Sequence, residues 1–388
     1  MMLQDMIREN VRNMPPSGIR KYFDMVNDME DAISLGIGEP DFVTPWNVVE
    51  SGIYSLEQGH THYSSNAGFM ELRREIANSL KNKYQLNYDP KDEIIVTVGG
   101  SEGIDIALRA LVGPGDEVII PEPSFVAYKG CTAFTGATPK ILNLRACDKF
   151  KLTPQLLEEA ITPKTKVVII PFPNNPTGAT MTRDELKSIV EVLKDRDIII
   201  ISDEIYSELT YEKTHVSIAS FPEIRDKTIV INGFSKAYAM TGWRLGYVCG
   251  NKILINAMKK IHQYAIMCSP TTAQYAAIEA LKNAENSVKG MVSEYNRRRR
   301  VMVSGFKNMG LECFEPLGAF YVFPSIKSTG MTSDKFCEEL LRKEKVLVIP
   351  GNAFGECGEG FIRACYASSM DHILEAMKRI ERFIKSIK

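Results

Sequence analysis

Short runs of apolar residues recur along the first two thirds of the chain, separated by stretches with apolar residues at helical spacing. The runs cover residues 94–98, 117–120, 166–170, 198–201 and 228–232. Leu72, Ile76 and Leu80 show the helical spacing ahead of the first run. Runs that are apolar at nearly every position are typical of strands buried on both faces. Strands that alternate with helices predict an α/β fold, with a mainly parallel central sheet and helices on both of its faces.

The last third of the chain changes to a helix–strand–helix pattern. Apolar strands are expected at residues 318–323 and 360–367, and an amphipathic helix at residues 370–387. A short strand that begins at Ile33 enters a loop rich in glycine and proline. We therefore expect three parts: an N-terminal arm with part of the smaller domain at residues 1–46, a large domain at residues 47–284, and a smaller α+β domain at residues 285–388.

Composition and charge narrow the range of functions. The 388 residues include 47 lysines and arginines against 48 aspartates and glutamates, so no overall basic charge points to nucleic acid or to a membrane surface. The longest apolar runs are too short to span a bilayer, and the first ten residues lack the apolar segment of a secretion signal. Eight scattered cysteines without a Cys-x-x-Cys pair suit reduced thiols in a cytoplasmic enzyme.

Two polar clusters have both a functional and a structural interpretation. His60 and His62 alternate on a loop without cysteine or carboxylate partners, so we interpret them as solvated or hydrogen-bonded and expect no metal site. Residues 297–300 are four arginines, which could bind a polyanion. In a chain of nearly neutral charge we interpret them instead as a solvated helix face.

Lys236 has the sequence surroundings of a nucleophilic amine. It follows the apolar run at residues 228–232, with Ser235 before it and Arg244 eight residues on. A lysine amine can form a Schiff base with an aldehyde cofactor, while a hydroxyl and a guanidinium hold the phosphate of that cofactor. A lysine on a solvated loop would not explain the Thr-Gly-Trp-Arg-Leu-Gly segment at residues 241–246.

Two further strand ends carry groups suited to the same cofactor. Glycines follow the first apolar run at a strand-to-helix turn, where backbone N–H groups and the helix dipole favour a phosphate. We assign this role to Gly100, Ser101 and Glu102, mostly through main-chain donors. Asp203 comes at the end of the fourth run. A buried carboxylate needs a cationic partner such as a pyridinium N–H, although Asp203 could also simply cap the next helical turn.

A polar turn follows one of the strands, and a charged residue interrupts a later strand. Asn-Pro-Thr-Gly at residues 175–178 is a turn by its chemistry, and it follows a buried strand at the edge where ligands bind in α/β sheets. Arg363 interrupts an apolar strand, so its guanidinium should be paired. The partner is either a structural aspartate, which is the usual one, or a substrate carboxylate held by the guanidinium fork.

The segment Ser-Lys-x-x-x-Met-Thr-Gly-Trp-Arg-Leu-Gly, at residues 235–246, resembles the signature of the class I and II aminotransferases, aspartate and aromatic aminotransferases among them. The likeness runs from about Ile33 to the C-terminus. It implies the fold of the type I pyridoxal-phosphate-dependent transferases, with a large and a smaller domain. It also implies pyridoxal 5′-phosphate as cofactor and an internal aldimine at Lys236, with Asp203 and Tyr206 as the other catalytic residues.

The resemblance assigns the remaining site residues. Against the cofactor it places Phe125 stacked on the pyridine ring, Asn175 at the 3-oxygen, Tyr206 by the phenolic oxygen, and Ser235 and Arg244 on the phosphate. Against the substrate carboxylate it places Arg363, Asn175 and the main chain at Gly38. Tyr63 would reach the phosphate of a neighbouring subunit, which implies a homodimer with shared active sites.

We expect an aminotransferase that moves an amino group from an L-amino acid to a 2-oxo acid by a ping-pong mechanism. The nearer alternatives are a carbon–sulfur β-lyase and a cyclopropane-carboxylate synthase, which resemble this fold and share the lysine. A regulator with an aminotransferase-like domain would need a helix-turn-helix domain in front of Ile33, and about thirty residues are too few for one. The substrate stays open among aromatic, acidic and diaminopimelate-type amino acids. Ser101 stands where some aspartate-using relatives have a lysine, which disfavours that mode of dicarboxylate recognition.

Overall fold

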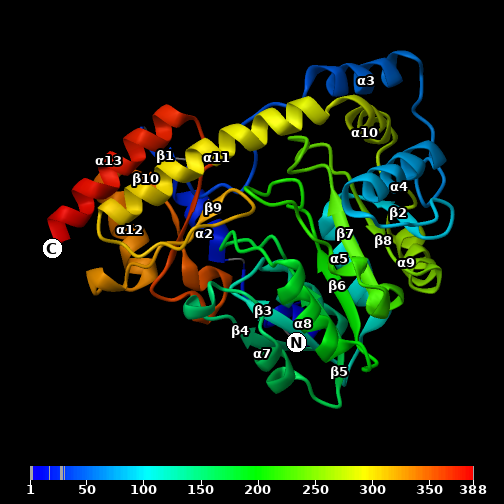
Figure 1. The fold of residues 1–388 in the computed structure, drawn as a ribbon, viewed down its shortest axis with the longest axis horizontal. Helices are drawn as coiled ribbons and strands as arrows, with labels where there is room; N and C mark the ends of the chain where they lie inside the picture. Colours follow the sequence, from blue (N-terminus) through cyan, green and yellow to red (C-terminus); the bar gives the residue numbers. More distant parts are fainter. Residues whose placement is uncertain (1–2, 17, 27–28, 30, 388) are drawn as a thin grey trace.

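Seven strands form the central sheet of the computed structural model, which describes residues 3–16, 18–26, 29 and 31–387 (Figure 1). In order across the sheet they are β2 (Ile94–Thr97), β8 (Gly246–Cys249), β7 (Thr228–Gly233), β6 (Ile199–Asp203), β5 (Thr165–Ile170), β3 (Glu117–Glu122) and β4 (Thr138–Asn143). Neighbouring strands pair in parallel except at β8, which is antiparallel to both β2 and β7. The expected α/β fold with a mainly parallel sheet is confirmed.

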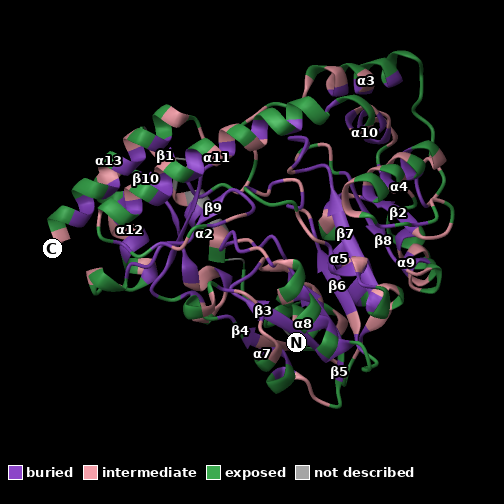
Figure 2. Ribbon diagram, in the orientation of Figure 1, coloured by how far each residue is buried: buried purple, intermediate pink, exposed green. Residues whose placement is uncertain are grey.

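The strands are buried on both faces because their alternate side chains enter different cores. In β5, Val167 and Ile169 pack into one core, and Val168 and Ile170 pack into another. Figure 2 shows buried residues concentrated in the strands and exposed residues along the outer sides of the helices. The helices of this part are α3 (Trp46–Glu57), α4 (Met70–Tyr84), α5 (Gly99–Leu111), α6 (Ala127–Thr135), α7 (Pro154–Ala160), α8 (Arg183–Leu193), α9 (Lys252–Ala265) and α10 (Thr271–Asn283).

These helices cover both faces of the sheet, as the sequence predicts. Helices α5, α6 and α9 pack over the core that contains Val167 and Ile169. Helices α7 and α8 pack over the opposite face, and α4 and α10 continue that face at the β2 end of the sheet. In α4, Leu72, Ile76 and Leu80 are all buried, which confirms the helical spacing read from the sequence.

The C-terminal third of the chain forms a second, smaller part together with the N-terminal segment. Strand β1 pairs in parallel with β10, while β11, β12 and β9 form an antiparallel sheet. Helices α11 and α13 run beside each other across this part (Figure 1). The elements are β1 (Ile33–Ser34), α11 (Glu285–Asn308), β9 (Tyr321–Val322), α12 (Ser333–Glu344), β10 (Val346–Leu347), β11 (Ile349–Pro350), β12 (Ile362–Cys365) and α13 (Met370–Ile387).

Short elements complete the chain. Ahead of β1 lie the helices α1 (Glu9–Arg12) and α2 (Gly18–Val26). The 3-10 helices are η1 (Leu3–Met6), η2 (Ala146–Asp148), η3 (Ile218–Ser220), η4 (Pro222–Lys227), η5 (Lys327–Thr329), η6 (Gly351–Phe354) and η7 (Glu356–Gly358). Within the described ranges, no helix is long and apolar enough to cross a membrane. Because β1 joins β10, we propose that residues 1–46 and 285–388 form the smaller domain beside a large domain of residues 47–284.

The sequence pattern anticipates most elements but misses strand β4 of the large sheet and the two-residue strands β10 and β11. Helix α13 coincides with the amphipathic helix expected at residues 370–387. Strand β4 was not predicted because it has no continuous apolar run. It lies at the edge of the sheet, only one of its six residues is buried, and it contains Pro139 and Lys140. Edge strands tolerate proline and lysine, since only one side of the backbone must pair.

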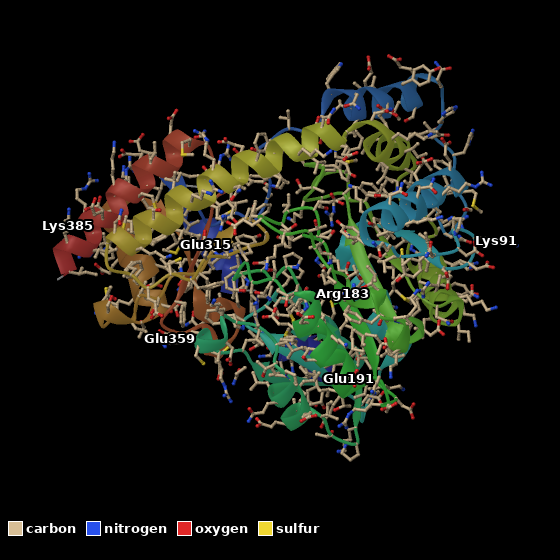
Figure 3. All side chains as sticks on the ribbon, viewed as in Figure 1. Lys91, Arg183, Glu191, Glu315, Glu359 and Lys385 are labelled. Atoms are coloured by element: carbon tan, nitrogen blue, oxygen red, sulfur yellow. The ribbon has the colours of Figure 1, made fainter. Side chains whose placement is uncertain are left out.

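The interpretation of residues 297–300 as a solvated helix face is wrong for two of the four arginines. Charged side chains such as Lys91 and Lys385 lie at the rim of the molecule (Figure 3), and the outer two arginines of the run are exposed as expected. Arg298 and Arg299, however, are buried. Two successive positions on a helix point toward different neighbours, so both can be buried when other segments cover them.

The buried arginines bind acidic side chains on distant segments. Arg298 donates to Asp41 over 2.8 Å. Arg299, whose side chain is fully buried, donates to Glu212 over 3.0 Å and to Glu315 over 2.8 Å. Since Glu212 lies beyond β6 and Arg299 lies on α11, this cluster ties the smaller part of the molecule to the large sheet. These three bonds join residues that are 257, 87 and 16 positions apart in the sequence.

We expect Arg299→Ala to lower the free energy of unfolding by about 2–3 kcal/mol, because it removes a buried side chain and its four hydrogen bonds. The matched control on the same helix is the exposed Arg300→Ala, which should change that free energy by less than about 0.5 kcal/mol. Guanidinium unfolding followed by circular dichroism measures both. Equal stability of the two variants would contradict a structural role for Arg299.

Candidate active site

A cavity of about 740 Å³ opens at the carboxyl ends of the parallel strands, where the large sheet meets the smaller part of the chain. All the site residues expected from the sequence line it, except Tyr63 and Glu102. Those that line it are Gly38, Gly100, Ser101, Phe125, Asn175, Asp203, Tyr206, Ser235, Lys236, Arg244 and Arg363. The convergence follows from the sheet, since parallel strands present their carboxyl ends at one edge.

Lys236 lies just beyond β7 with its amine held inside the cavity. Its Nζ donates a hydrogen bond of 2.7 Å to the carbonyl oxygen of Gly38. Burial lowers the pKa of Lys236 from 10.5 to about 8, against an opposing effect of the Glu39 carboxylate and with a smaller contribution from the positive charges of Arg363 and Arg244. About half of the amine is therefore neutral near pH 8, and a neutral amine is the form that attacks an aldehyde.

Asp203 is the last residue of β6, and its carboxylate is buried. One oxygen accepts a hydrogen bond of 2.6 Å from the hydroxyl of Tyr128, and the other accepts one of 3.1 Å from the backbone N–H of Ile205. Burial raises the pKa of Asp203. No salt bridge reaches this carboxylate from the described part of the chain. A ligand that brings a protonated ring nitrogen would supply the missing positive charge.

Tyr128 was not found from the sequence. It lies in the first turn of α6, three residues after Phe125, and its ring meets that of Phe125 edge to face at 5.7 Å. Burial raises the pKa of Tyr128 well above 10, so its hydroxyl remains a donor to Asp203. Only the fold brings α6 and β6 together, so the sequence offered no signal for this contact.

Tyr206 has a second unexpected partner, Tyr321 of β9. Their hydroxyl oxygens lie 2.9 Å apart, and burial raises the pKa of both groups. The Tyr321 hydroxyl also lies directly against Gly38, where a Cβ atom would collide with it. The glycine that was expected to admit a substrate carboxylate is thus also required by a neighbouring tyrosine. Tyr321 brings the smaller part of the molecule into the cavity.

The opposite end of the cavity combines backbone N–H groups with a guanidinium. Gly100 and Ser101 lie in the first turn of α5, whose leading N–H groups have no partner within the helix. A Cβ atom at Gly99 would lie 2.7 Å from Nη2 of Arg244, so glycine lets the guanidinium approach the turn. Ser235 is buried and lines the cavity as well. Together these donors can bind a phosphate.

The carboxylate of Glu102 does not line the cavity. One of its oxygens accepts a hydrogen bond from the backbone N–H of Val98, and the other lies 2.5 Å from Nδ1 of His262 on α9. His262 is fully buried, and its Nε2 has no hydrogen-bond partner among the described residues. The side chain of Glu102 therefore stabilises the turn before α5 from outside the cavity. Only the main chain of Glu102 is placed to donate to a phosphate. His262 was not found from the sequence.

Arg363 projects from β12 at the other end of the cavity. Its Nη1 donates to the Asn175 side chain over 2.9 Å, and its Nη2 donates to the carbonyl oxygen of Gly36 over 2.5 Å. The guanidinium stacks between the rings of Tyr321 and Phe354, at 4.5 and 4.6 Å. Its buried Nε lacks a partner, and no carboxylate in the described ranges pairs with it. The alternative of a structural aspartate therefore has no support, and a bound carboxylate fits the site.

Tyr63 and the two neighbouring histidines lie outside the cavity. The Tyr63 side chain is 80% exposed on the loop between α3 and α4, so its expected role toward a neighbouring subunit stays a prediction. The His60 ring stacks on Tyr275, with the two centroids 4.9 Å apart. Over the residues that the structure covers, no group of three or more histidine, cysteine or acidic side chains could hold a metal ion.

The groups in the cavity fit pyridoxal phosphate, the cofactor that the sequence implies. The turn at Gly100 and Arg244 provide donors for its phosphate. Among the described residues, no cation forms a salt bridge with the buried carboxylate of Asp203 and no acid forms one with the buried amine of Lys236. The Nε–H of Arg363 likewise has no partner there and is available for a carboxylate. A cofactor with a substrate would supply a partner for each of these buried groups.

A family model, related sequences and solved structures all match this chain to aminotransferases. Residues 30–380 match the family described as aminotransferase class I and II. The Bacillus subtilis (strain 168) protein YugH, named as an aminotransferase, is 52% identical over 97% of this chain and 98% of its own length. The aspartate aminotransferase of Pyrococcus horikoshii is 44% identical over 98% of each chain. The solved structure of the Thermus thermophilus aspartate aminotransferase with maleate superimposes with a TM-score of 0.92 at 35% identity, covering 97% of this chain and 99% of that chain.

We expect His262→Leu to weaken the affinity for pyridoxal phosphate about tenfold or more, because the buried Glu102 carboxylate behind the phosphate turn loses a hydrogen bond. Titration of the cofactor-free protein, followed by absorbance, gives the dissociation constant. His262→Gln, which can keep a donor, should lose less, and the exposed His372→Leu should lose nothing. A correctly folded His262→Leu protein with unchanged affinity would show that this contact does not support the turn.

Proposed function

This chain belongs to the class I and II aminotransferases and is a pyridoxal-phosphate-dependent transaminase, and we propose that Lys236, Asp203 and Arg363 carry out its central steps. The proposal is that an L-amino acid and a 2-oxo acid bind in turn to the same cavity and exchange the amino group by a ping-pong sequence. One observation carries it: the buried amine of Lys236, the buried carboxylate of Asp203 and the guanidinium of Arg363 line one cavity.

Several residues are proposed to position the cofactor. Pyridoxal phosphate, when bound, supplies an aldehyde for the amino group and a ring that withdraws electrons from the substrate α-carbon. Arg244, Ser235 and the main chain at Gly100, Ser101 and Glu102 would hold its phosphate. Phe125 would stack on the ring, and Tyr206 and Asn175 would donate to its phenolic oxygen. Asp203 would keep the ring nitrogen protonated, since the ionised carboxylate needs a cation in this buried position.

Lys236 is proposed to move the proton at the substrate α-carbon. Once its amine is free, about half of it is neutral at pH 8, because burial lowers its pKa to about 8. A neutral amine can take the proton from the α-carbon and return it at the other end of the reacting group. The hydrogen bond from Nζ to the carbonyl of Gly38 would hold the amine at the substrate end of the cavity.

Arg363 is proposed to orient the substrate by its α-carboxylate. The guanidinium is fixed by Asn175, by the carbonyl of Gly36 and by two aromatic rings, so it needs little reorganisation when a carboxylate binds. The main chain at Gly38 lies next to this position. A carboxylate held there would place the α-carbon near Lys236, because Gly36 and Gly38 are two residues apart on one loop.

We propose a homodimer in which Tyr63 contributes to the phosphate site of the partner. Tyr63 and Tyr264 are 80% and 90% exposed, and a hydrogen bond from Asn66 to the Met267 carbonyl holds their two segments together. Such an exposed aromatic surface is typical of a protein interface. We also propose that the enzyme is cytoplasmic, since all eight cysteines are free thiols.

The function is tested by adding single amino acids to the holoenzyme without any 2-oxo acid. The absorbance of the cofactor should change to that of its amine form, and a 2-oxo acid should restore the original spectrum. Lys236→Ala should lower the rate by about 10²–10⁴-fold, because the proton carrier is lost. The exposed Lys187→Ala is the control and should keep the wild-type rate. A wild-type rate in Lys236→Ala, or release of ammonia without an amino acceptor, would contradict the proposal.

The dimer is tested by sedimentation velocity of the holoenzyme. A mass of about twice the 43.5 kDa of the chain is expected. Tyr63→Phe should weaken cofactor affinity without dissociating the dimer, because it removes one hydroxyl donor at the phosphate and keeps the ring. A monomer with full activity would be incompatible with shared active sites.

A further inference from the structure

The hydroxyl groups of Tyr206 and Tyr321 form a pair at the wall of the cavity. Their oxygens lie 2.9 Å apart, and the distance allows either hydroxyl to be the donor. Both residues line the cavity, yet Tyr206 is only 4% exposed and Tyr321 only 1%, so the pair is shielded from bulk water. Neither hydroxyl has another hydrogen-bond partner among the described residues. Each has a single proton to donate, so a partner outside the pair decides the direction of the bond.

Neighbouring groups fix this pair from several sides. The Tyr321 ring lies under the Arg363 guanidinium at 4.5 Å and meets the Phe320 ring edge to face at 4.9 Å. The rings of Tyr206 and Phe320 also meet edge to face, at 5.4 Å. On its other side the Tyr321 hydroxyl lies against Gly38, where a Cβ atom would collide with it. Because close-packed aromatic rings have little freedom to move, the packing of the fold sets the distance between the two hydroxyls.

Burial keeps both hydroxyls protonated. It raises the pKa of Tyr206 and that of Tyr321, and at Tyr321 the positive charge of Arg363 opposes only part of the effect. In the proposed function Tyr206 donates its proton to the phenolic oxygen of the cofactor. The Tyr206 oxygen is then an acceptor, and the Tyr321 hydroxyl, 2.9 Å away, is placed to donate to it. Two hydroxyls in such a chain polarise each other, so that each hydrogen bond strengthens the next.

We propose that Tyr321 is a positioning residue that donates to Tyr206 and thereby strengthens the hydrogen bond from Tyr206 to the phenolic oxygen of the cofactor. This inference rests on the proposed function, because it assumes that the cofactor binds with that oxygen at Tyr206. Tyr321 takes no part in the proton transfer at the α-carbon. Since Tyr321 belongs to β9 and Tyr206 follows β6, this bond is a route by which the smaller part of the molecule acts on the cofactor.

The direction of the effect follows from where negative charge lies on the cofactor. When the cofactor is joined to Lys236, the linkage between them can bind a proton, which the neighbouring phenolic oxygen then shares. In the unprotonated form that oxygen carries its full negative charge. A hydroxyl donor therefore stabilises the unprotonated form more strongly and lowers the pKa of the linkage. Loss of the Tyr321 hydroxyl should raise this pKa, because the donor at the oxygen becomes weaker.

The test is a pH titration of the cofactor absorbance in the holoenzyme. Tyr321→Phe should raise the midpoint by about 0.5–1 unit, as expected for the loss of one hydrogen bond. The KM for an amino acid should stay within about twofold, because a phenylalanine ring still lies under Arg363. The matched control is Tyr366→Phe, which removes another buried hydroxyl of the smaller part. That hydroxyl donates to the Ala319 carbonyl over 3.1 Å and does not line the cavity, so the midpoint should not change.

A double variant shows whether Tyr321 acts through Tyr206. Tyr206→Phe alone should raise the midpoint more than Tyr321→Phe does, because it removes the hydroxyl that reaches the cofactor. Adding Tyr321→Phe to the Tyr206→Phe protein should then produce no further shift. Equal shifts from Tyr321→Phe in both backgrounds would overturn the inference, and so would an unchanged midpoint in Tyr321→Phe alone. A wild-type protein that binds no pyridoxal phosphate would instead contradict the proposed function.

Discussion

Parallel strands must end at the same edge of their sheet, and the site of this protein follows from that constraint. Phe125 comes after β3, Asn175 after β5, Asp203 at the end of β6 and Lys236 after β7. These residues are spread over more than a hundred positions of the sequence, yet they line one cavity. The β-branched runs that bury each strand on both faces therefore also fix where the polar residues that follow them must lie.

Desolvation gives these polar residues their chemical properties. Burial lowers the pKa of Lys236 to about 8 and raises the pKa of Asp203. In water both groups would be fully ionised at neutral pH and surrounded by solvent. Inside the cavity neither has an oppositely charged partner in a salt bridge within the described ranges, and the Nε of Arg363 is also unsatisfied. Buried charged groups without partners among the described residues are typical of a site that binds a charged cofactor and substrate.

The smaller part of the molecule completes the cavity and couples it to the rest of the fold. Tyr321 of β9 contacts both Tyr206 and Gly38, while Arg363 of β12 binds Asn175 of the large sheet and the carbonyl of Gly36. Strand β1 leads into the Gly36–Gly38 loop and pairs with β10. The positions of the substrate-binding groups therefore depend on how the two parts of the chain pack, and the buried cluster around Arg299 contributes to that packing.

Local sequence patterns predicted most strands and the long amphipathic helices, and together with the family resemblance they predicted half of the residues that line the cavity. Each of these predictions uses only residues that are adjacent in the sequence. The apolar run of β6, for example, ends at Asp203, and the run of β7 leads to Lys236. Contacts between distant segments were beyond such patterns. The bonds of Tyr128 to Asp203 and of Tyr206 to Tyr321 join residues 75 and 115 positions apart. The burial of Arg298 and Arg299 likewise required Asp41, Glu212 and Glu315 to be brought to one helix. Apolar periodicity reports how a segment is buried, whereas the partner of a polar side chain is set only when the segments pack.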